Sequence, residues 1–97
     1  MIVERFTWKA KIGCRDEVVK LVKALAEEDG MTPRVCTYTY GSVSLVTSDF
    51  EFETEEDRIK YWKDFDWSAP AFTEWEKKYP NLIESYAGNH RELLQVH

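Results

Sequence analysis

The clearest periodic pattern of hydrophobic positions lies between residues 16 and 30. Its apolar residues recur at the i, i+3, i+4 and i+7 positions of a helix: Val18, Leu21, Val22 and Leu25. Asp16 is a candidate N-cap, and Gly30 supplies the left-handed residue that commonly ends a helix. The pattern therefore predicts one amphipathic helix that buries a single apolar stripe.

A second pattern, rich in Val, Thr, Tyr and Phe, fills residues 34–40 and 43–52. These segments flank Gly41-Ser42, and glycine at the first position of a two-residue loop is typical of a type II′ hairpin. Pairing outward from that turn places Tyr38 opposite Leu45, an aromatic side chain against an aliphatic one. We therefore expect an antiparallel hairpin in this part of the chain.

The later helices are predicted from the residues at their ends. Thr54 and Asp57 resemble a capping box with Asp in place of Glu or Gln, so a helix is expected to follow Thr54. Ser68 is expected to cap a further helix with Pro70 in its first turn, where a missing N–H costs little. Pro80 is expected to interrupt that helix, with an offset turn or short helix over residues 81–86.

Residues 2–10 and 90–96 supply two more predicted strands, which gives the order β-α-β-β-α-(α)-β in one domain spanning residues 1–97. This order is the split β-α-β, or ferredoxin-like, pattern of the α+β class, with a four-stranded antiparallel sheet and helices on one face. The strands carry Phe, Trp, Val, Tyr and Leu on mixed faces. We therefore expect a second copy to cover the other face, in a homodimer formed through the sheet.

Composition and charge exclude several classes of protein. With 43% hydrophobic and 32% charged residues, the chain is neither a disordered segment nor a membrane protein. A net charge of −5, with basic residues scattered among acidic ones, argues against nucleic-acid binding. No apolar run approaches the ~20 residues of a membrane span, and the first residues lack a signal-peptide pattern. We therefore expect a cytoplasmic protein with no membrane partner.

The two cysteines, Cys14 and Cys36, form no CxxC pair and have no histidines nearby at metal-ligand spacing. They indicate neither a metal site nor a disulfide framework, and we interpret both as buried or half-buried thiols in a reducing compartment. The chain also has no glycine-rich phosphate loop and no nucleophile elbow. No metal and no cofactor is therefore expected.

Aromatic residues are dense, with four Trp, five Tyr and five Phe. A pocket for a flat hydrophobic ligand is one use for them. The candidate ligand-binding residues are Trp8, Tyr38, Tyr40, Trp67 and Trp75. The alternative is that these rings only build the core and a subunit interface, since aromatics at helical spacing are more often core.

The most suggestive polar cluster is His90 with its neighbours Asn89 and Arg91. A histidine with a pKa near neutral can move protons, and an arginine can hold an anionic oxygen. Arg5, on the first strand, is a second candidate for an anion contact. The catalytic candidates are therefore His90, Arg91 and Arg5, and the alternative is that they face solvent or pair within the sheet or across a dimer.

Four segments, which together span nearly the whole chain, carry a family resemblance: residues 4–13, 37–41, 50–54 and 85–93. They read ERFTWKAKIG, TYTYG, FEFET and SYAGNHREL. On these segments the chain resembles the dimeric α/β-barrel superfamily, and is most similar to small NIPSNAP-like proteins and their antibiotic-biosynthesis-monooxygenase relatives. The resemblance implies a homodimer whose two sheets form a barrel, with a cleft between each sheet and its helices or inside the barrel.

A narrower resemblance concerns haem-degrading monooxygenases of this superfamily. Residues 71–75, AFTEW, look like their Ala-Phe-x-x-Trp helix segment, so Trp75 matches. The position of the haem-ligating histidine falls near Ser85, and the first strand has no asparagine. Serine is a poor iron ligand, so a haem enzyme is not expected.

Three functional hypotheses follow. The first is a dimeric barrel protein that binds a small molecule in its aromatic cleft. The second is a structural or interaction module with no ligand. The third is a cofactor-independent monooxygenase or isomerase that acts on a small hydrophobic or aromatic substrate and uses His90 with Arg5 or Arg91.

Overall fold

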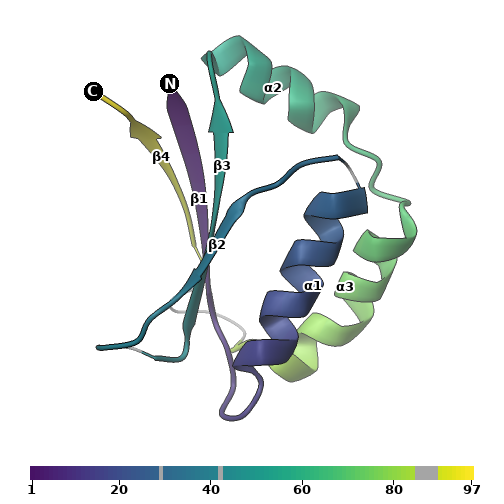
Figure 1. The fold of residues 1–97 in the computed structure, drawn as a ribbon. Helices are drawn as coiled ribbons and strands as arrows, with labels where there is room; N and C mark the ends of the chain where they lie inside the picture. The colour runs from purple at the N-terminus through teal and green to yellow at the C-terminus, as the bar shows by residue number, and fades with distance from the viewer. Residues whose placement is uncertain (29, 42, 85–89) are drawn as a thin grey trace.

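The structure is a computed structural model that describes residues 1–28, 30–41, 43–84 and 90–97, the last range without the side chain of His90. Its elements, in chain order, are β1 (Ile2–Lys9), α1 (Arg15–Glu28), β2 (Arg34–Thr37), β3 (Leu45–Phe52), α2 (Glu55–Asp64), α3 (Pro70–Leu82) and β4 (His90–Gln95). The four strands form an antiparallel sheet in the order β2-β3-β1-β4. The predicted ferredoxin-like α+β fold is confirmed (Figure 1).

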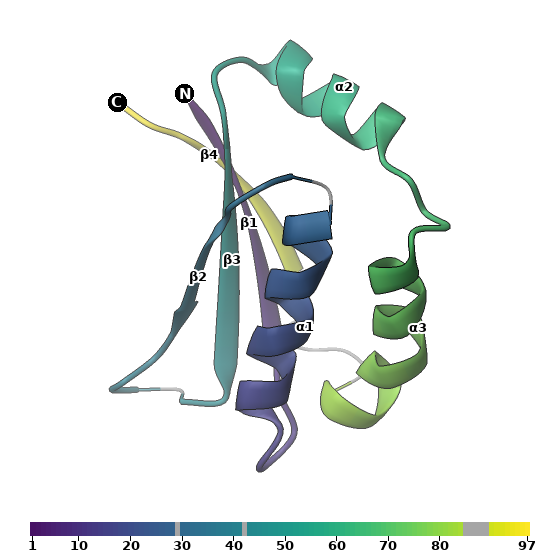
Figure 2. The same ribbon diagram turned by 45° about the vertical axis from the view of Figure 1, so that its right-hand side comes forward.

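The helices lie on one side of the sheet. Figures 1 and 2 show α1 and α3 side by side there, while α2 crosses near the end of the sheet at which both chain termini lie. We call this side the helix face, and it carries Glu4, Phe6 and Trp8 of β1. The opposite side, the open face, carries Arg5 and the other odd-numbered residues of β1, because successive side chains of a strand point to opposite faces.

The core fills the space between α1 and the helix face. Val18 and Val22 of α1 pack with Val46 of β3, and all three are 2% exposed or less. Ala26, one helical turn further on, packs with Phe50 of β3 in a second cluster. The predicted apolar stripe is therefore the surface that fixes α1 to the sheet.

The C-terminal end of α1 follows the prediction, and its N-terminal end does not. Gly30 adopts φ 76°, its N–H donates to the carbonyl of Glu27 (3.0 Å), and the N–H of Met31 donates to that of Ala26 (2.9 Å). This is a Schellman cap, which needs a left-handed residue. Asp16 is not the N-cap: α1 already begins at Arg15, so Asp16 lies in the first turn, where its charge favours the positive helix end.

The ends of α2 and α3 differ in how they are capped. Thr54 caps α2 as predicted, because its hydroxyl accepts a hydrogen bond from the N–H of Asp57 (3.1 Å). The prediction of Ser68 as a cap is wrong: its N–H and hydroxyl donate to Asp66 (2.9 and 2.6 Å), and α3 begins at Pro70 with no side-chain cap of its own. The carboxylate of Glu28, at the end of α1, instead accepts from the N–H of Ala71 (2.7 Å).

Pro80 does not interrupt α3, which continues to Leu82. Proline removes one helical hydrogen bond, but here the last turn is tied to the chain that follows β1. Lys11 donates from its backbone N–H to the carbonyl of Leu82 (2.8 Å) and from its Nζ to that of Pro80 (3.0 Å). Of the offset turn expected over residues 81–86, Ser85 and Tyr86 lie outside the described residues.

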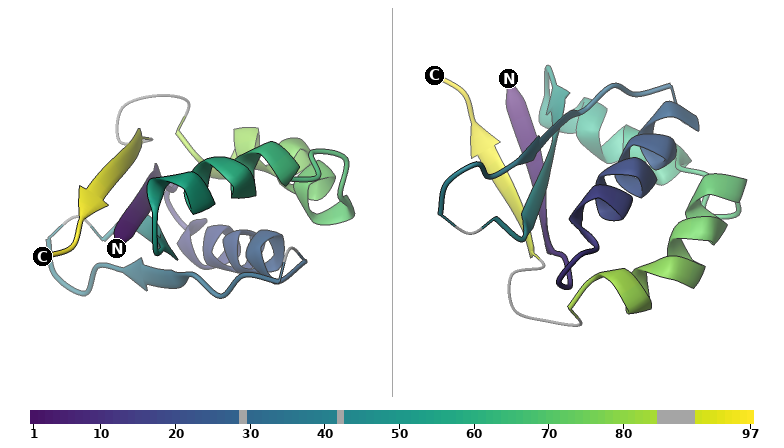
Figure 3. Two further views of the ribbon diagram at one scale, coloured as in Figure 1. Left: turned by 90° about the horizontal axis from the view of Figure 1, so that it is seen from above. Right: turned by 60° about the horizontal axis from the view of Figure 1, so that its bottom comes forward.

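The predicted hairpin has the expected register but a shorter ladder. Thr37 pairs with Val46, which is the register that would bring Tyr38 opposite Leu45, yet β2 ends at Thr37. Gly41 adopts φ 86°, and Ser42 lies outside the described residues. The connection between β2 and β3 projects away from the helices, on the side of the open face (Figures 1 and 3).

The open face is more polar than the sequence suggested. The Phe and Trp side chains of β1 and β3 lie on the helix face, whereas Arg5 and Asp49 pair on the open face. A row of alternating charge crosses all four strands there, because the register places these residues side by side: Arg34, Asp49, Arg5 and Glu92. Apolar side chains do lie on both faces as expected, because the register places Val3, Leu45 and Leu94 on the open face, but the Phe and Trp rings of β1 and β3 lie on the helix face.

The two cysteines are free thiols. Cys14 is half-buried as expected, but Cys36 is exposed, which corrects the expectation for that residue. Its position on β2, the strand at one edge of the sheet, explains the difference. Within the described ranges, no helix combines the length and apolar character needed to cross a membrane.

Candidate ligand-binding site

A pocket of about 330 Å³ lies between the helix face of the sheet and the three helices. Of the thirteen described residues that line it, nine are aromatic. They include every tryptophan of the chain: Trp8, Trp62, Trp67 and Trp75. Three further lining residues are aliphatic, and the thirteenth is Arg91 of β4. The wall is therefore apolar, with one cationic group.

Edge-to-face and stacked contacts hold the rings in place. Trp8 stacks on Phe6 with their centroids 5.8 Å apart and their planes 8° apart, and it meets Trp75 of α3 edge-on at 5.5 Å. Trp67, between α2 and α3, contacts Phe72 at 5.1 Å and remains 56% exposed. Such pairs contribute about 0.5–1.5 kcal/mol each beyond their buried area. The pocket thus has a rigid inner wall and an exposed ring at its edge.

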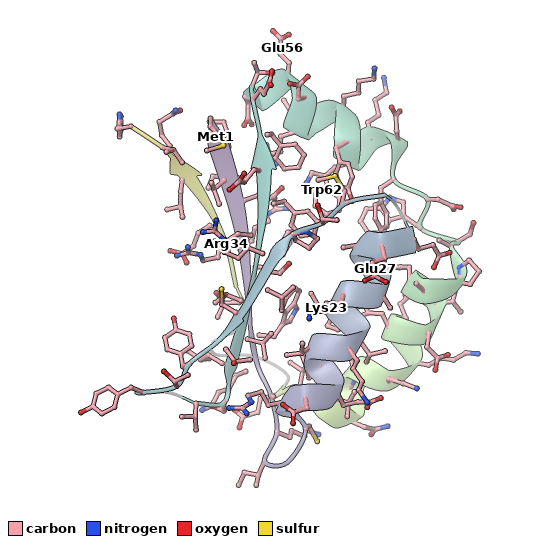
Figure 4. All side chains as sticks on the ribbon, viewed as in Figure 1. Met1, Lys23, Glu27, Arg34, Glu56 and Trp62 are labelled. Carbon is pink, nitrogen blue, oxygen red and sulfur yellow. The ribbon has the colours of Figure 1, made fainter. Side chains whose placement is uncertain are left out.

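Trp62 joins α2 to the sheet. In Figure 4 its side chain lies in the space between the sheet and the helices. Its ring meets Phe6 edge-on at 5.8 Å and stacks with Trp67 at 6.3 Å. No residue of α2 is fully buried, so this helix is held on the sheet largely by its aromatic side chains.

Beneath Trp62 lies a fully buried carboxylate, Glu4 of β1. Its Oε1 accepts a hydrogen bond from the indole N–H of Trp62. Its Oε2 is 3.6 Å from Nη1 of Arg58 and 3.4 Å from Nε of Arg91, and it accepts no hydrogen bond. Arg58 itself donates from Nε to Glu55 (3.0 Å), which raises the pKa of Arg58. Two guanidinium groups therefore balance two carboxylates at this end of the sheet.

Three of the five predicted ligand-binding residues, Trp8, Trp67 and Trp75, meet at this pocket. Tyr38 and Tyr40 do not: they lie beside Arg5 in a shallow hollow on the open face. Tyr38 is 41% exposed and Tyr40 is 92% exposed. The structure thus divides the predicted set between the two faces of the sheet.

Neither Glu4 nor Trp62 was among the site residues predicted from the sequence. A signal for Glu4 was available, because it shares the alternation that brings Phe6 and Trp8 to the same face. An acidic residue on the aromatic side of a strand needs a partner when buried. Trp62 offered no comparable signal, because its contact with Glu4 depends on the path of α2 across the sheet.

The catalytic candidates do not form one group. The register pairs Arg5 with Glu92, and Phe6 with Arg91, so Arg5 and Arg91 lie on opposite faces. Arg5 donates two hydrogen bonds to Asp49 (2.8 and 2.9 Å), which raises the pKa of Arg5. Asn89 lies outside the described residues, as does the side chain of His90. The described ranges contain no cluster of three or more His, Cys, Asp or Glu side chains arranged to hold a metal ion.

The sequence matches no family model and no curated protein. Its structure, in contrast, superposes on solved structures over nearly its whole length. A NIPSNAP family protein from Agrobacterium tumefaciens is similar with a TM-score of 0.73 and 19% identity, covering 97% of this chain and 90% of that one. A NIPSNAP-like domain protein from Burkholderia xenovorans gives 0.76 and 16%, covering 99% and 84%.

An antibiotic biosynthesis monooxygenase-type protein from Deinococcus radiodurans is similar with a TM-score of 0.66 and 9% identity, covering 100% of this chain and 93% of that one. At such identities the likeness concerns the fold and leaves the activity open. The chain therefore shares its ferredoxin-like α+β fold with NIPSNAP family proteins and antibiotic biosynthesis monooxygenase-like proteins, as the sequence resemblance predicted.

Proposed function

We propose that this protein binds a small, flat and largely apolar molecule in the aromatic pocket. The observation that carries the proposal is the convergence of all four tryptophans on one cavity of about 330 Å³. They come from β1, α2, α3 and the α2–α3 connection. Ligand pockets have volumes of roughly 300–1,000 Å³ and mostly apolar walls, so this cavity has the size for a small ring system.

The pocket also argues against a purely structural role for these rings. Protein interiors are close-packed, with few voids larger than a water molecule. Rings that served only as core would close on one another, as Val18 and Val46 do under α1. Instead they surround a cavity, and Trp67 remains 56% exposed at its edge. Binding accounts for both features.

The proposal is tested by NMR titration with 2-naphthamide, a flat and neutral probe. The four indole N–H signals all report on the pocket, and we expect them to shift in a saturable manner. Trp67→Ala should weaken binding about fivefold to tenfold, because one wall of the pocket is lost. Tyr40→Ala is the matched control, since it removes an exposed aromatic ring from the other face.

Two results would contradict the proposal. One is the absence of indole shifts at millimolar probe. The other is an equal effect of Trp67→Ala and Tyr40→Ala, which would place binding outside the pocket or make it unspecific. The hypothesis that the protein is a cofactor-independent monooxygenase or isomerase stays a prediction.

We also propose that a second copy of the chain covers the open face. The row Arg34, Asp49, Arg5 and Glu92 alternates in sign across the sheet. A two-fold axis along the strands would face each charge with its opposite in the partner. The connection that carries Tyr40 (92% exposed) and Val43 (53% exposed) projects on the same side and offers apolar surface to that partner.

Sedimentation equilibrium should give a dimer at micromolar concentration, and a stable monomer would overturn this proposal.

A further inference from the structure

We infer that Arg91 binds the acidic group of the ligand, so that the natural ligand is a flat aromatic or apolar monoacid. This inference rests on the proposed function of the aromatic pocket and adds the chemical class of its occupant. Among the described residues that line the cavity, Arg91 is the one that carries a charge. A single polar group in an apolar pocket is what fixes the orientation of a ligand.

Arg91 has hydrogen-bond donors available for a ligand. Its Nε lies 3.4 Å from Oε2 of Glu4, and within the described part of the chain its guanidinium donates no hydrogen bond. Its side chain is 60% exposed. A guanidinium carries five N–H donors in a planar fork that matches the two oxygens of a carboxylate. The Nη edge of Arg91 is thus the edge left for the ligand.

Glu4 holds Arg91 at the pocket wall. This carboxylate is fully buried and is itself fixed by the indole N–H of Trp62. It is therefore a positioning residue for Arg91, although it does not line the cavity. The second guanidinium beside it, that of Arg58, already donates hydrogen bonds to Glu55, whereas Arg91 contacts Glu4 at 3.4 Å without a hydrogen bond.

The charge of the site favours one negative charge over two. The carboxylates of Glu4 and Glu55 already balance the guanidinium groups of Arg58 and Arg91. The whole chain has a net charge of −5. A doubly charged phosphate would be repelled by this negative potential and would find one half-exposed arginine to bind it. A carboxylate on an apolar ring carries one charge, can accept two hydrogen bonds from the guanidinium, and places its ring against the aromatic wall.

The test compares 2-naphthoate with 2-naphthamide, which have nearly the same shape but differ by one charge. Calorimetry at neutral pH should give a naphthoate affinity about tenfold above that of naphthamide, the lower end of what a charge-assisted hydrogen bond contributes at a half-exposed site. Arg91→Gln should reduce this ratio to about one, because the charge-assisted bond that favours naphthoate is lost. Arg15→Gln, which removes an arginine from α1 outside the pocket, should keep the wild-type ratio.

Arg91→Lys keeps the charge but loses the fork, and should give an intermediate ratio. It also keeps the inference testable if Arg91→Gln fails to fold, since equal ratios in Arg91→Lys and wild type would overturn it. Equal affinity of wild type for the two probes would overturn the inference while the proposed pocket function stands. If neither probe binds to wild type, both are overturned.

Discussion

The two faces of this sheet use acidic and basic residues in opposite ways. On the helix face a single carboxylate, Glu4, is fully buried among aromatic rings and lies near two guanidinium groups without a hydrogen bond from either. On the open face Asp49 accepts two hydrogen bonds from Arg5, whose side chain is 40% exposed. The fully buried carboxylate, Glu4, is thus loosely paired with its arginines, whereas Asp49 is tightly paired with an arginine that is 40% exposed.

This difference indicates two roles. A half-exposed ion pair contributes little to stability, because water and salt screen it. A buried charge is costly unless it is satisfied, so Glu4 with its unbonded Oε2 is the less favourable arrangement of the two. Binding sites commonly keep polar groups in such an arrangement for a ligand or for the residue that contacts it. This difference supports the two proposals made above, a ligand on the helix face and a second copy of the chain on the open face.

The largest expected effect is on the buried side of this comparison. Glu4→Ala should lower the free energy of unfolding by about 3 kcal/mol, because it leaves the indole N–H of Trp62 without an acceptor and opens a cavity. Asp49→Ala should cost about 1 kcal/mol, because Arg5 can turn to solvent. Urea denaturation followed by circular dichroism measures both values.

Glu4→Gln is the control for this pair, because the amide oxygen can still accept from Trp62. It should be less destabilising than Glu4→Ala by at least about 1 kcal/mol. If Glu4→Ala and Asp49→Ala lower the free energy of unfolding by the same amount, the buried carboxylate is no more important for stability than the one on the open face, and the comparison of the two faces fails.

A second, smaller effect concerns the open face alone. Arg34→Glu and Glu92→Arg should each weaken the dimer about tenfold, because each places like charges opposite one another across the interface. The double variant should recover affinity to within about threefold of wild type. Repulsion within one sheet increases in the double variant, so recovery can only come from the partner. Sedimentation equilibrium measures the dissociation constants, and an additive loss in the double variant would contradict the charge row as the dimer contact.

The elements themselves could largely be predicted from local signals. The helical stripe of α1 and the Gly30 cap act within one turn, and the hairpin register follows from the pattern of its two strands. Errors arose where tertiary contacts outweigh local preference. Pro80 is tolerated because Lys11 binds the last turn of α3. At the other end of α3, Ser68 donates to Asp66, and Glu28 of α1 accepts from the N–H of Ala71 in its place.

The site was less predictable than the fold, for a geometric reason. Period-two alternation on β1 is enough to group Trp8 with Phe6 and Glu4. It does not indicate that α2 delivers Trp62 to Glu4, because that contact joins residues 58 positions apart across a helix whose placement no local pattern determines. Alternation also could not place Tyr40, which lies on the open face and not in the pocket. This residue lies past the end of β2, where the alternation of a strand no longer applies.

The smallest effect expected is a pH dependence at the exposed end of the same network. The guanidinium of Arg58 bonds to Glu55 in the first turn of α2 and lowers the pKa of that carboxyl from its ordinary value of 4.5. A carboxyl with a lowered pKa in the folded state stabilises the protein above that ordinary value and loses this contribution as the pH falls through the folded pKa. Glu55→Gln should therefore be slightly less stable than wild type at pH 7, and the difference should shrink as the pH falls below 4.5 and through the lowered pKa of Glu55. Glu56→Gln, in the same helical turn, controls for a carboxylate near the helix end, because it removes the charge without removing the bond to Arg58. If Glu55→Gln and Glu56→Gln show the same pH dependence of stability, the interaction of a carboxylate with the helix dipole accounts for it. The ion pair between Glu55 and Arg58 then adds no stability of its own beside the buried carboxylate of Glu4.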